Sequence, residues 1–439
     1  MEVRLAGFNT DAENRSSTPE TLSAAYARIS RDPRPIGLLR REAASEMERA
    51  RESNRRIVFG YGHGSVAEHA FFNFDLLDLS RLAAEAVQSF RLASFTEKSQ
   101  RYIRLERDWV IPEEVPSALR DEWTASLEGL FGLYGRACRA LEEAGLSEGR
   151  AREDARYLLP LATSCQMGMS LNARELEHMI RRLSAHPLAE VRQLSSQLLD
   201  SAEGVAPSLL RHLEPVAMDH LAWQHPEPGN LELPGDVALV RGDDDGVVGA
   251  RLLQRDRGGS LKTARHGWPD LESDEKRRLF RNVLGSLGPY DALPREWELA
   301  CFTFEVVVSA SAYAQLKRHR MSTQLVSAYS PALGIRVPSS FADNGLEGLL
   351  EEADAISQAW GQRLDDRAAE YMFTNAHRRA VVVRLNAREM YHFARLRLDS
   401  HAQWDIRDLA GRMVDLAVAA APLTMASAAA RGSGGASPR

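Results

Sequence analysis

The sequence predicts an α+β protein made of two homologous halves, each a sheet packed against long helices. One observation behind this prediction is an ordered set of internal matches: EHAFFNF (68–74) recurs as ELACFTF (298–304), and LNARELEH (171–178) recurs as LNAREMYH (385–392). Another is a change, within each half, from strand-like apolar segments to segments with helical spacing of apolar residues. Because the matches lie 230 and 214 residues apart, they indicate a duplicated domain and not an array of short repeats.

The composition is that of a globular protein. The chain has 439 residues, enough for two domains, with 44% hydrophobic and 26% charged residues. The formal net charge of −6 argues against a general binder of nucleic acid or of membrane surfaces. No apolar stretch approaches the roughly 20 residues that span a bilayer, and the first residues contain no apolar signal region. We therefore expect a cytoplasmic protein, with Cys138, Cys165 and Cys301 as reduced thiols.

The expected elements follow from local spacing and propensity. Apolar residues with helical spacing predict helices, and alternating or β-branched segments predict strands. Helices are expected at 19–30, 36–59 and 189–210, and strands at 70–79, 237–241, 247–253 and 301–310. A Pro- and Gly-rich segment indicates a linker, and the composition of the last residues indicates a flexible tail. The expected division is a first half at 1–224, a linker at 225–236, a second half at 237–428 and a tail at 429–439.

One short segment carries an unusual row of polar side chains. FTEKSQRY (95–102) places Glu97, Ser99 and Arg101 at every second position. In an extended backbone these three side chains lie on one face. Arg101 can form a forked pair with a phosphate, and Ser99 can donate a further hydrogen bond. The alternative is a solvated strand edge with a surface ion pair.

The segments after the strand of each half resemble the signature of the flavin-dependent thymidylate synthases. That signature is Arg-His-Arg, seven residues, Ser, one residue and Arg, with a Glu two positions before the Ser. The first half keeps Glu97, Ser99 and Arg101, but has Ser89-Phe90-Arg91 where Arg-His-Arg belongs. In the resembling family the Glu/Ser/Arg part holds deoxyuridine monophosphate (dUMP).

The second half shows the opposite loss. It keeps Arg318, His319 and Arg320, the part that chiefly contacts the flavin in the resembling family. It has Val326, Ala328 and Ser330 where Glu, Ser and Arg belong. The resemblance therefore implies that the two halves divide the binding of nucleotide and flavin between them. An ordinary basic helix turn is the alternative for the Arg-His-Arg segment.

Further positions of the first half resemble the family. HGSVAEHA (63–70) matches a family block in which His63 and Ser65 would contact the flavin, and His63 is also a candidate catalytic residue. The second half has Leu293 and Arg295 at these places. A zinc site built from His63, Glu68 and His69 would fit no standard spacing, so we expect no metal.

Two further residues are candidates for substrate binding, because they match positions of the resembling family. ARYLLP (155–160) matches a family segment and makes Arg156 a second candidate for the substrate phosphate, whereas the second half has Glu370 there. Gln315 matches a family glutamine near the substrate, whereas the first half has Ala86.

The Asn-Ala-Arg segment is present in both halves. In the resembling family its positions line the flavin, which gives six further cofactor candidates: Asn172, Arg174, His178, Asn386, Arg388 and His392. Because a motif kept in both copies can be structural, packing of a helix surface between the halves is the alternative.

The resemblance also names a catalytic candidate. Arg397, in RLRLDSHAQWDIR (395–407), falls where the family has an arginine against the uracil ring, and the first half has Leu183 there. A guanidinium at this place would favour negative charge on the pyrimidine and activate C5. No cysteine stands at a motif position, so a covalent thiol mechanism has no evident nucleophile.

The resemblance implies a fold like that of the flavin-dependent thymidylate synthases and the reductive methylation of dUMP to thymidylate. FAD would be the cofactor, with methylenetetrahydrofolate and NADPH as co-substrates. Two alternatives remain open: C5-alkylation of another uridine nucleotide, and a catalytically silent homologue that binds nucleotide or flavin. Because the family forms homotetramers, two copies of this duplicated chain would supply four halves, so we expect a homodimer.

Overall fold

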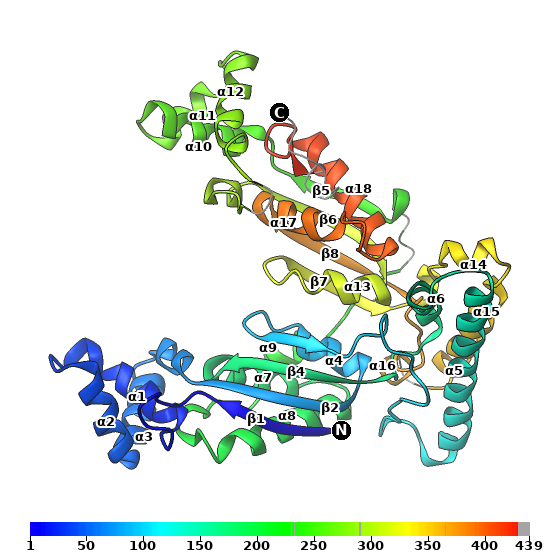
Figure 1. Ribbon diagram of the computed structural model, residues 1–439, viewed down its shortest axis with the longest axis horizontal. Helices are drawn as coiled ribbons and strands as arrows, with labels where there is room; N and C mark the ends of the chain where they lie inside the picture. Colours follow the sequence, from blue (N-terminus) through cyan, green and yellow to red (C-terminus); the bar gives the residue numbers. More distant parts are fainter. Residues whose placement is uncertain (230, 232, 289–290, 365, 429–439) are drawn as a thin grey trace. The chain divides into compact units, whose positions relative to one another are not determined.

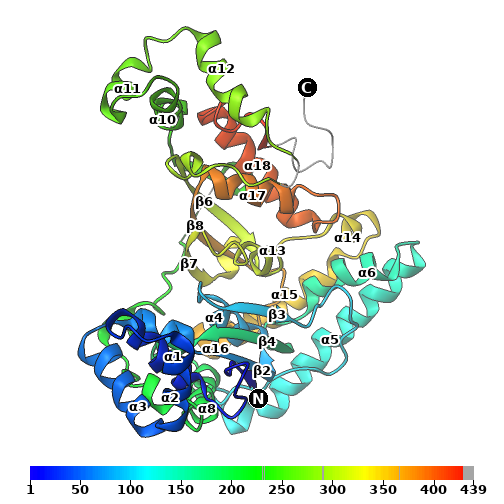
Figure 2. The same cartoon turned by 60° about the vertical axis from the view of Figure 1, so that its left-hand side comes forward.

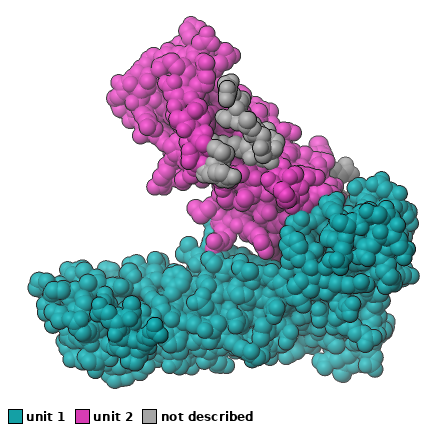
Figure 3. Space-filling view, in the orientation of Figure 1, with its two compact units in different colours: residues 1–224, 337–375 teal, residues 225–336, 376–439 magenta. Residues whose placement is uncertain are grey.

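The computed structural model describes residues 1–229, 231, 233–288, 291–364 and 366–428. These residues form two compact units, shown in Figure 3: residues 1–224 with 337–375 (unit 1), and residues 225–336 with 376–439 (unit 2). The expected tail at 429–439 lies outside the described residues. Each unit combines one four-stranded sheet with helices, so the predicted α+β class is confirmed.

The two sheets have the same topology. Both sheets are antiparallel. The strand order is β1-β2-β4-β3 in unit 1 and β5-β6-β8-β7 in unit 2, so the second strand of each unit lies between the first and the fourth. The strands are β1 Glu2–Phe8, β2 Phe71–Ser80, β3 Ser94–Glu97, β4 Ser164–Asn172, β5 Val237–Gly242, β6 Cys301–Ser309, β7 Thr323–Tyr329 and β8 Arg378–Asn386 (Figure 1). The shared order is the structural counterpart of the internal sequence matches.

The helices cover the sheets and extend beyond them. Those of unit 1 are α1 Pro19–Arg28, α2 Ile36–Ser45, α3 Met47–Asn54, α4 Arg81–Gln88, α5 Arg120–Glu143, α6 Glu148–Ala155, α7 Ala173–Ser184, α8 Ala189–Glu203, α9 Ala217–Leu221, α14 Ser339–Asp343, α15 Glu347–Gly361 and α16 Asp366–Ala369. Those of unit 2 are α10 Asp245–Arg257, α11 Leu261–Gly267, α12 Ser273–Leu284, α13 Ala310–Leu316, α17 Ala387–Arg397 and α18 Trp404–Ala420. Among the described residues, no helix is both long and apolar enough to cross a membrane.

Equivalent serines start the helix after the second strand in each unit. The hydroxyl of Ser80 accepts a hydrogen bond from the backbone N–H of Ala83, and Ser309 does the same for Ala312. Such N-caps satisfy backbone donors that the first turn of a helix leaves unpaired. The cap ends each strand at a defined residue, so the helix and the loop after it begin at equivalent places in both units.

Residues 337–375 of the second half belong to unit 1. There α15 packs against α5, as Figure 1 and Figure 2 show, and the indole of Trp360 lies 4.9 Å from that of Trp123. The contact between the segments is reciprocal. The backbone N–H of Leu161 donates to Phe373, and that of Asn375, the equivalent of Leu161, donates to Leu159, the equivalent of Phe373. This reciprocity is the mark of a local two-fold relation between repeated segments.

Several sequence expectations need correction. Residues 247–253, expected as a strand, lie in α10, because Asp244 caps a helix there by accepting from the N–H of Gly246. The helix expected at 36–59 is broken at Glu46, whose backbone leaves the helical region. The helix expected at 189–210 ends at Glu203, and the chain then turns into the short 3₁₀ segment Pro207–Leu209.

Candidate functional site

Glu97, in unit 1, lies at the end of β3 and is almost fully buried. Its Cα is paired with that of Met167 on β4, and its side chain is 5% exposed. Arg81, the first residue of α4, forms an ion pair with its carboxylate, and the amide of Gln88 donates to it over 2.9 Å. The carboxylate is therefore held in one position by two neighbours from the same helix.

The expectation of one extended row at 97, 99 and 101 is wrong beyond Glu97. β3 ends at that residue, and the chain turns, with the N–H of Ile103 donating to the carbonyl of Ser99. The hydroxyl of Ser99 accepts from the backbone N–H of Arg101 over 3.2 Å. Lys98 still contacts β4, because its backbone N–H donates to the carbonyl of Gln166. Ser99 and Arg101 are thus placed by a turn and not by strand alternation.

Arg156 is the most unusual charged residue of unit 1. It is 8% exposed, and its Nε and one terminal nitrogen have no hydrogen-bond partner among the described residues. Burial lowers its pKa, while the charges of Glu153 and of Arg101 and Arg81 act on it in opposite directions. A buried guanidinium with unused donors is costly unless it gains an anionic partner.

Arg101 is the second cation near Arg156. It forms an ion pair with Glu153, which also pairs with Arg150 over 2.8 Å. Glu153 is only 2% exposed, whereas the side chains of Arg101 and Arg150 are 27% and 50% exposed. Three arginines, at 81, 101 and 156, therefore surround two buried carboxylates, at 97 and 153. The unused donors of Arg156 suit a phosphate-bearing ligand.

Unit 2 has different side chains at the equivalent place in the sheet. The sheet register pairs Val326 with Val381, as Glu97 pairs with Met167, so Val326 occupies the position of Glu97. Next to it the buried guanidinium of Arg379 lies over the ring of Tyr329 at 4.2 Å and over that of Tyr313 at 5.1 Å. In unit 2 the guanidinium of Arg379 therefore lies close to two aromatic rings.

His63 and Ser65 lie together on the surface of unit 1. His63 precedes the 3₁₀ segment Gly64–His69, and both His63 and Ser65 are exposed. The ring of His63 lies 6.4 Å from that of Tyr61. A Cβ on Gly64 would lie 3.3 Å from Nε of Arg174, so glycine permits the close approach of this segment to α7. The segment therefore presents a histidine and a hydroxyl beside the Asn-Ala-Arg helix of unit 1.

The Asn-Ala-Arg segments have a clear structural role in both units. Asn172 and Asn386 cap α7 and α17, each accepting a backbone N–H three residues later. Arg174 pairs with Glu68 over 2.6 Å, and Arg388 pairs with Glu298 over 2.7 Å. The same caps and ion pairs therefore recur in both copies of the motif. The ring of His178 packs edge-on against Phe90 at 5.4 Å, and its equivalent, His392, packs in the same way against His319, the counterpart of Phe90, at 5.8 Å.

Arg318, His319 and Arg320 form the loop between α13 and β7. Arg318 and Arg320 are exposed, whereas His319 is 4% exposed. Nδ1 of His319 lies 3.2 Å from the carboxylate of Glu389. Arg397 donates through Nε to Nε2 of His319 over 3.0 Å and through a terminal nitrogen to the backbone carbonyl of Gln315 over 3.1 Å. The structure thus brings three predicted residues of unit 2 together: His319, Arg397 and Gln315.

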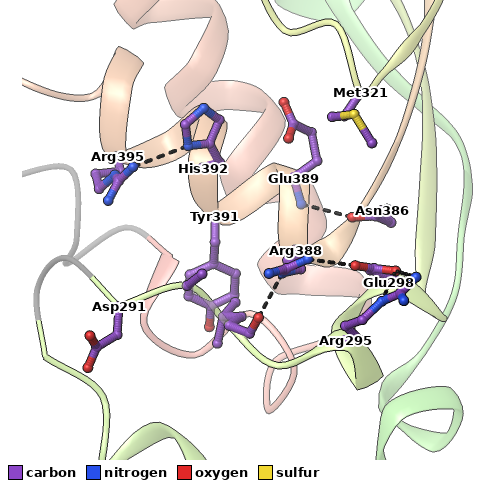
Figure 4. Close-up of a pocket in the computed structure, with 12 residues that line it drawn as sticks. Asp291, Arg295, Glu298, Met321, Asn386, Arg388, Glu389, Tyr391, His392 and Arg395 are labelled. Carbon is purple, nitrogen blue, oxygen red and sulfur yellow. Dashed lines mark hydrogen bonds and ion pairs between the residues drawn. The ribbon is translucent and has the colours of Figure 1, made fainter. Parts of the chain in front are cut away.

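A pocket of about 380 Å³ opens in unit 2 beside this loop (Figure 4). Its volume falls in the range of small-molecule sites. It is lined by Asp291, Ala292, Leu293, Arg295, Glu298, Met321, Asn386, Arg388, Glu389, Tyr391, His392 and Arg395. Three predicted cofactor residues, Asn386, Arg388 and His392, are among them. The three arginines are matched by three carboxylates, so the pocket offers paired donors and acceptors and little net charge.

His319, Glu389 and His392 also meet the distance requirement for a metal site. One ligand atom from each lies within 4.8 Å of the others. However, Arg397 already donates to His319, and Arg395 lies 3.3 Å from Nδ1 of His392. Two guanidinium groups beside a divalent cation would repel it, so the hydrogen bonds account for the cluster better than a metal does.

Sequence reasoning missed four residues that hold the candidates in place: Arg81, Gln88, Glu153 and Glu389. Arg81 and Gln88 could have been suspected, because they lie on one helix face seven residues apart and precede the polar row. Glu153 stands three residues before Arg156 on a helix, a spacing that brings side chains together. Glu389 has an equivalent, Glu175, in the first half. Because both halves have the same residue type at this position, the sequence does not indicate a special role for Glu389.

Comparison with known proteins gives a match to the same family in each half. The model of the family described as thymidylate synthase complementing protein matches residues 14–208 and 244–423. A flavin-dependent thymidylate synthase of Clostridium tetani is 29% identical over 232 residues, which cover 50% of this chain and 92% of the relative. UPF0159 protein Ta1429 of Thermoplasma acidophilum is 23% identical over 462 residues, covering 89% of this chain and 91% of the relative.

Among solved structures, the flavin-dependent thymidylate synthase ThyX of Helicobacter pylori complexed with FAD and dUMP is similar. It is 22% identical, covers 49% of this chain and 100% of that chain, and has a TM-score of 0.38. Because the family matches once in each half, the predicted duplication is confirmed. The chain belongs to the thymidylate synthase complementing protein family, that of the flavin-dependent thymidylate synthases.

Proposed function

We propose that the protein is an FAD-dependent thymidylate synthase that converts dUMP to thymidylate, with methylenetetrahydrofolate as carbon donor and NADPH as reductant. The observation that carries this proposal beyond family membership is Arg156, whose buried guanidinium has two nitrogens without a partner in the described structure. Such a group fits the phosphate of a nucleotide better than it fits a packed core.

The nucleotide would be held by unit 1. Arg156 and Arg101 would take the phosphate, and Arg101 would then exchange its pair with Glu153 for that with the phosphate. Ser99 would donate one further hydrogen bond, and Glu97, fixed by Arg81 and Gln88, would accept from the nucleotide. On the second half, Gln315 would contribute an amide to the substrate.

The flavin would be held by the Arg-His-Arg loop and the Asn-Ala-Arg helices. The donor set fits such a cofactor: the pocket in unit 2 combines guanidinium, amide and imidazole groups with the ring of Tyr391. Arg318 and Arg320 are exposed and would take its phosphates, with His319 buried between them. His63, Ser65, Asn172, Arg174 and His178 would supply the corresponding contacts from unit 1. When bound, FAD supplies the hydride chemistry of the reaction.

Arg397 would act on the pyrimidine. Its guanidinium is half-buried and is held by His319 and by the carbonyl of Gln315, so the orientation of the charged group is fixed. A fixed positive charge beside the ring favours the form in which negative charge develops and C5 becomes nucleophilic. His63, exposed on unit 1, is the second candidate for contact with the reacting groups. We further propose a cytoplasmic homodimer that contains four halves.

A tritium-release assay tests this function. Purified protein is incubated with 5-tritiated dUMP, FAD, methylenetetrahydrofolate and NADPH, and each component is omitted in turn. The proposal predicts that tritium is released and thymidylate is formed only in the complete mixture. Release from 5-tritiated UMP, with none from dUMP, would instead indicate alkylation of another uridine nucleotide. Bound flavin without any release would identify a catalytically silent homologue.

A further inference from the structure

Three side chains of unit 2 form a continuous chain of hydrogen bonds that was not predicted from the sequence. Glu389 lies 3.2 Å from Nδ1 of His319, and Nε2 of the same ring lies 3.0 Å from Nε of Arg397. The chain is well shielded: the side chains of His319 and Glu389 are 3% and 11% exposed. The ring of Phe393 packs edge-on against that of His319 at 4.8 Å.

The contacts of His319 determine where its proton lies. A guanidinium can only donate, so Nε2 must be the acceptor and carries no hydrogen. The proton of the neutral ring is therefore on Nδ1, where the carboxylate of Glu389 accepts it. A doubly protonated ring would have a hydrogen on both nitrogens and could not accept from Arg397.

We propose that Glu389 and His319 are positioning residues for Arg397: Glu389 fixes the Nδ1–H tautomer of His319, and Nε2 of His319 then aligns the guanidinium for the substrate ring. This inference rests on the proposed function, in which Arg397 acts on the pyrimidine. It gives His319 a task beyond contact with the flavin, and it gives Glu389, which no motif marks, a task of its own.

The first half lacks both the imidazole and the arginine of this chain of hydrogen bonds, which supports the proposal. The equivalent of Glu389 there is Glu175, which accepts from the backbone N–H of Leu92 over 3.2 Å. Phe90 stands in place of His319, and the fully buried Leu183 stands in place of Arg397. Where the arginine is absent, the imidazole is absent too, and the carboxylate has another partner.

The charges around His319 favour its neutral form. Burial lowers the pKa of His319, Glu389 raises it, and Arg397 and His392, on the same helix as Glu389, lower it. Arg318 and Arg320 flank it in its own loop, and both are exposed. The ring is thus kept able to accept from Arg397 at neutral pH.

Histidine-labelled full-length protein gives a direct test by NMR, because the ring nitrogen and carbon shifts distinguish the two neutral tautomers and the charged form. The signal of His319 is assigned by its absence in His319→Asn. The proposal predicts the Nδ1–H tautomer at pH 7.5. Glu389→Gln should keep this tautomer, because its amide oxygen still accepts, whereas Glu389→Leu should lose it. Glu175→Leu, the matched change in unit 1, should leave the signal of His319 unchanged.

Kinetics connect the tautomer to turnover. Glu389→Leu should lower kcat by on the order of 10- to 100-fold with little change in the KM for dUMP, and Glu389→Gln should retain most of kcat. A wild-type ring in the Nε2–H or charged form would overturn the proposal, even if Glu389→Leu did not fold. So would a Glu389→Leu protein with normal tautomer and normal kcat. If the tautomers are as predicted but wild-type protein forms no thymidylate, the proposed function fails while the role of Glu389 in orienting Arg397 stands.

Discussion

The two units have the same sheet but have kept different chemistry. Unit 1 retains a polar cluster around Glu97 and Arg156, whereas unit 2 has Val326 in the first position and Arg379, close to two tyrosine rings, next to it. Unit 2 retains His319 and Arg397, whereas unit 1 has Phe90 and Leu183.

This difference suggests a general rule for duplicated chains. A site used in both copies must keep its residues in both, but a site that needs one residue from each copy releases the other two from selection. The released positions have not become empty. Apolar or aromatic residues stand there: Val326 in unit 2, and Phe90 and Leu183 in unit 1.

The largest effect is expected from Arg397, the residue that unit 1 has lost. Arg397→Ala should lower kcat by on the order of 10²–10³-fold, because its charge is most needed when the pyrimidine becomes anionic. The KM for dUMP should change much less. Steady-state kinetics measure both, with Arg407→Ala, on the exposed side of α18, as a control. A variant that loses binding but turns over normally would show that Arg397 is a substrate anchor.

The next effect separates the two units by ligand. Arg101→Ala should weaken dUMP binding by about 10- to 150-fold, corresponding to a lost charge-assisted contact of about 1.5–3 kcal/mol, and should leave FAD bound. Arg318→Ala should do the reverse. Calorimetric titration of both variants with each ligand measures the four affinities. Equal loss of the same ligand in both would refute the division of tasks.

A smaller effect concerns stability and belongs to unit 1. Burial, with the charges of Arg367 and Arg192, lowers the pKa of His186 to about 3. Its Nδ1 accepts from the N–H of Leu188 over 3.1 Å, which requires the neutral ring. Below its unfolded pKa of about 6.5, the unfolded chain binds a proton that the folded unit does not. The free energy of unfolding should therefore fall by about 1.4 kcal/mol per pH unit as the pH drops from about 6.5 towards 3.

Urea unfolding between pH 7.5 and 5 measures this dependence. His186→Asn should flatten it, because the side-chain oxygen can accept the same hydrogen bond and has no proton to gain. The exposed His220, changed in the same way, serves as the control. If the pH dependence were the same in His186→Asn and wild type, another group would have to be responsible.

The smallest effect is expected from the cysteines. Replacing Cys138, Cys165 and Cys301 together with Ala should leave turnover largely intact, at a packing cost of about 1 kcal/mol for each buried site. Cys138 and Cys165 are buried, and burial raises the pKa of Cys138, which disfavours a thiolate. Turnover per folded protein is the measure. A folded triple variant that binds both ligands but is inactive would require covalent catalysis.

Much of the fold could be read from the sequence, because duplication left matched segments and strands have strong local signals. The alignment of Glu97 with Val326 agrees with the register of both sheets. Local sequence patterns failed to predict the secondary structure where tertiary contacts determine it. Residues 247–253 are rich in β-branched and apolar residues, yet the cap at Asp244 and the packing of α10 against α11 and α12 make them helical.

The site was predictable in its residue types but not in its supporting contacts. Arg156 and His319 could be named from motif positions, whereas their partners could not. Glu389 has the same residue type as Glu175, and only the imidazole opposite it gives it a different role. The membership of residues 337–375 in unit 1 was also beyond sequence reasoning, because an exchanged segment has the same pattern as one that packs within its own half.

The central claim, that each site takes one part from each half, is tested most directly by ligand stoichiometry. Purified full-length protein is titrated with FAD and with dUMP, and bound ligand per chain is counted by absorbance and calorimetry, with the mass of the assembly measured in the same solution. We predict one FAD and one dUMP per chain in a dimer, because each chain has one Glu97/Ser99/Arg101 segment and one Arg-His-Arg segment. Two of either ligand per chain would contradict it.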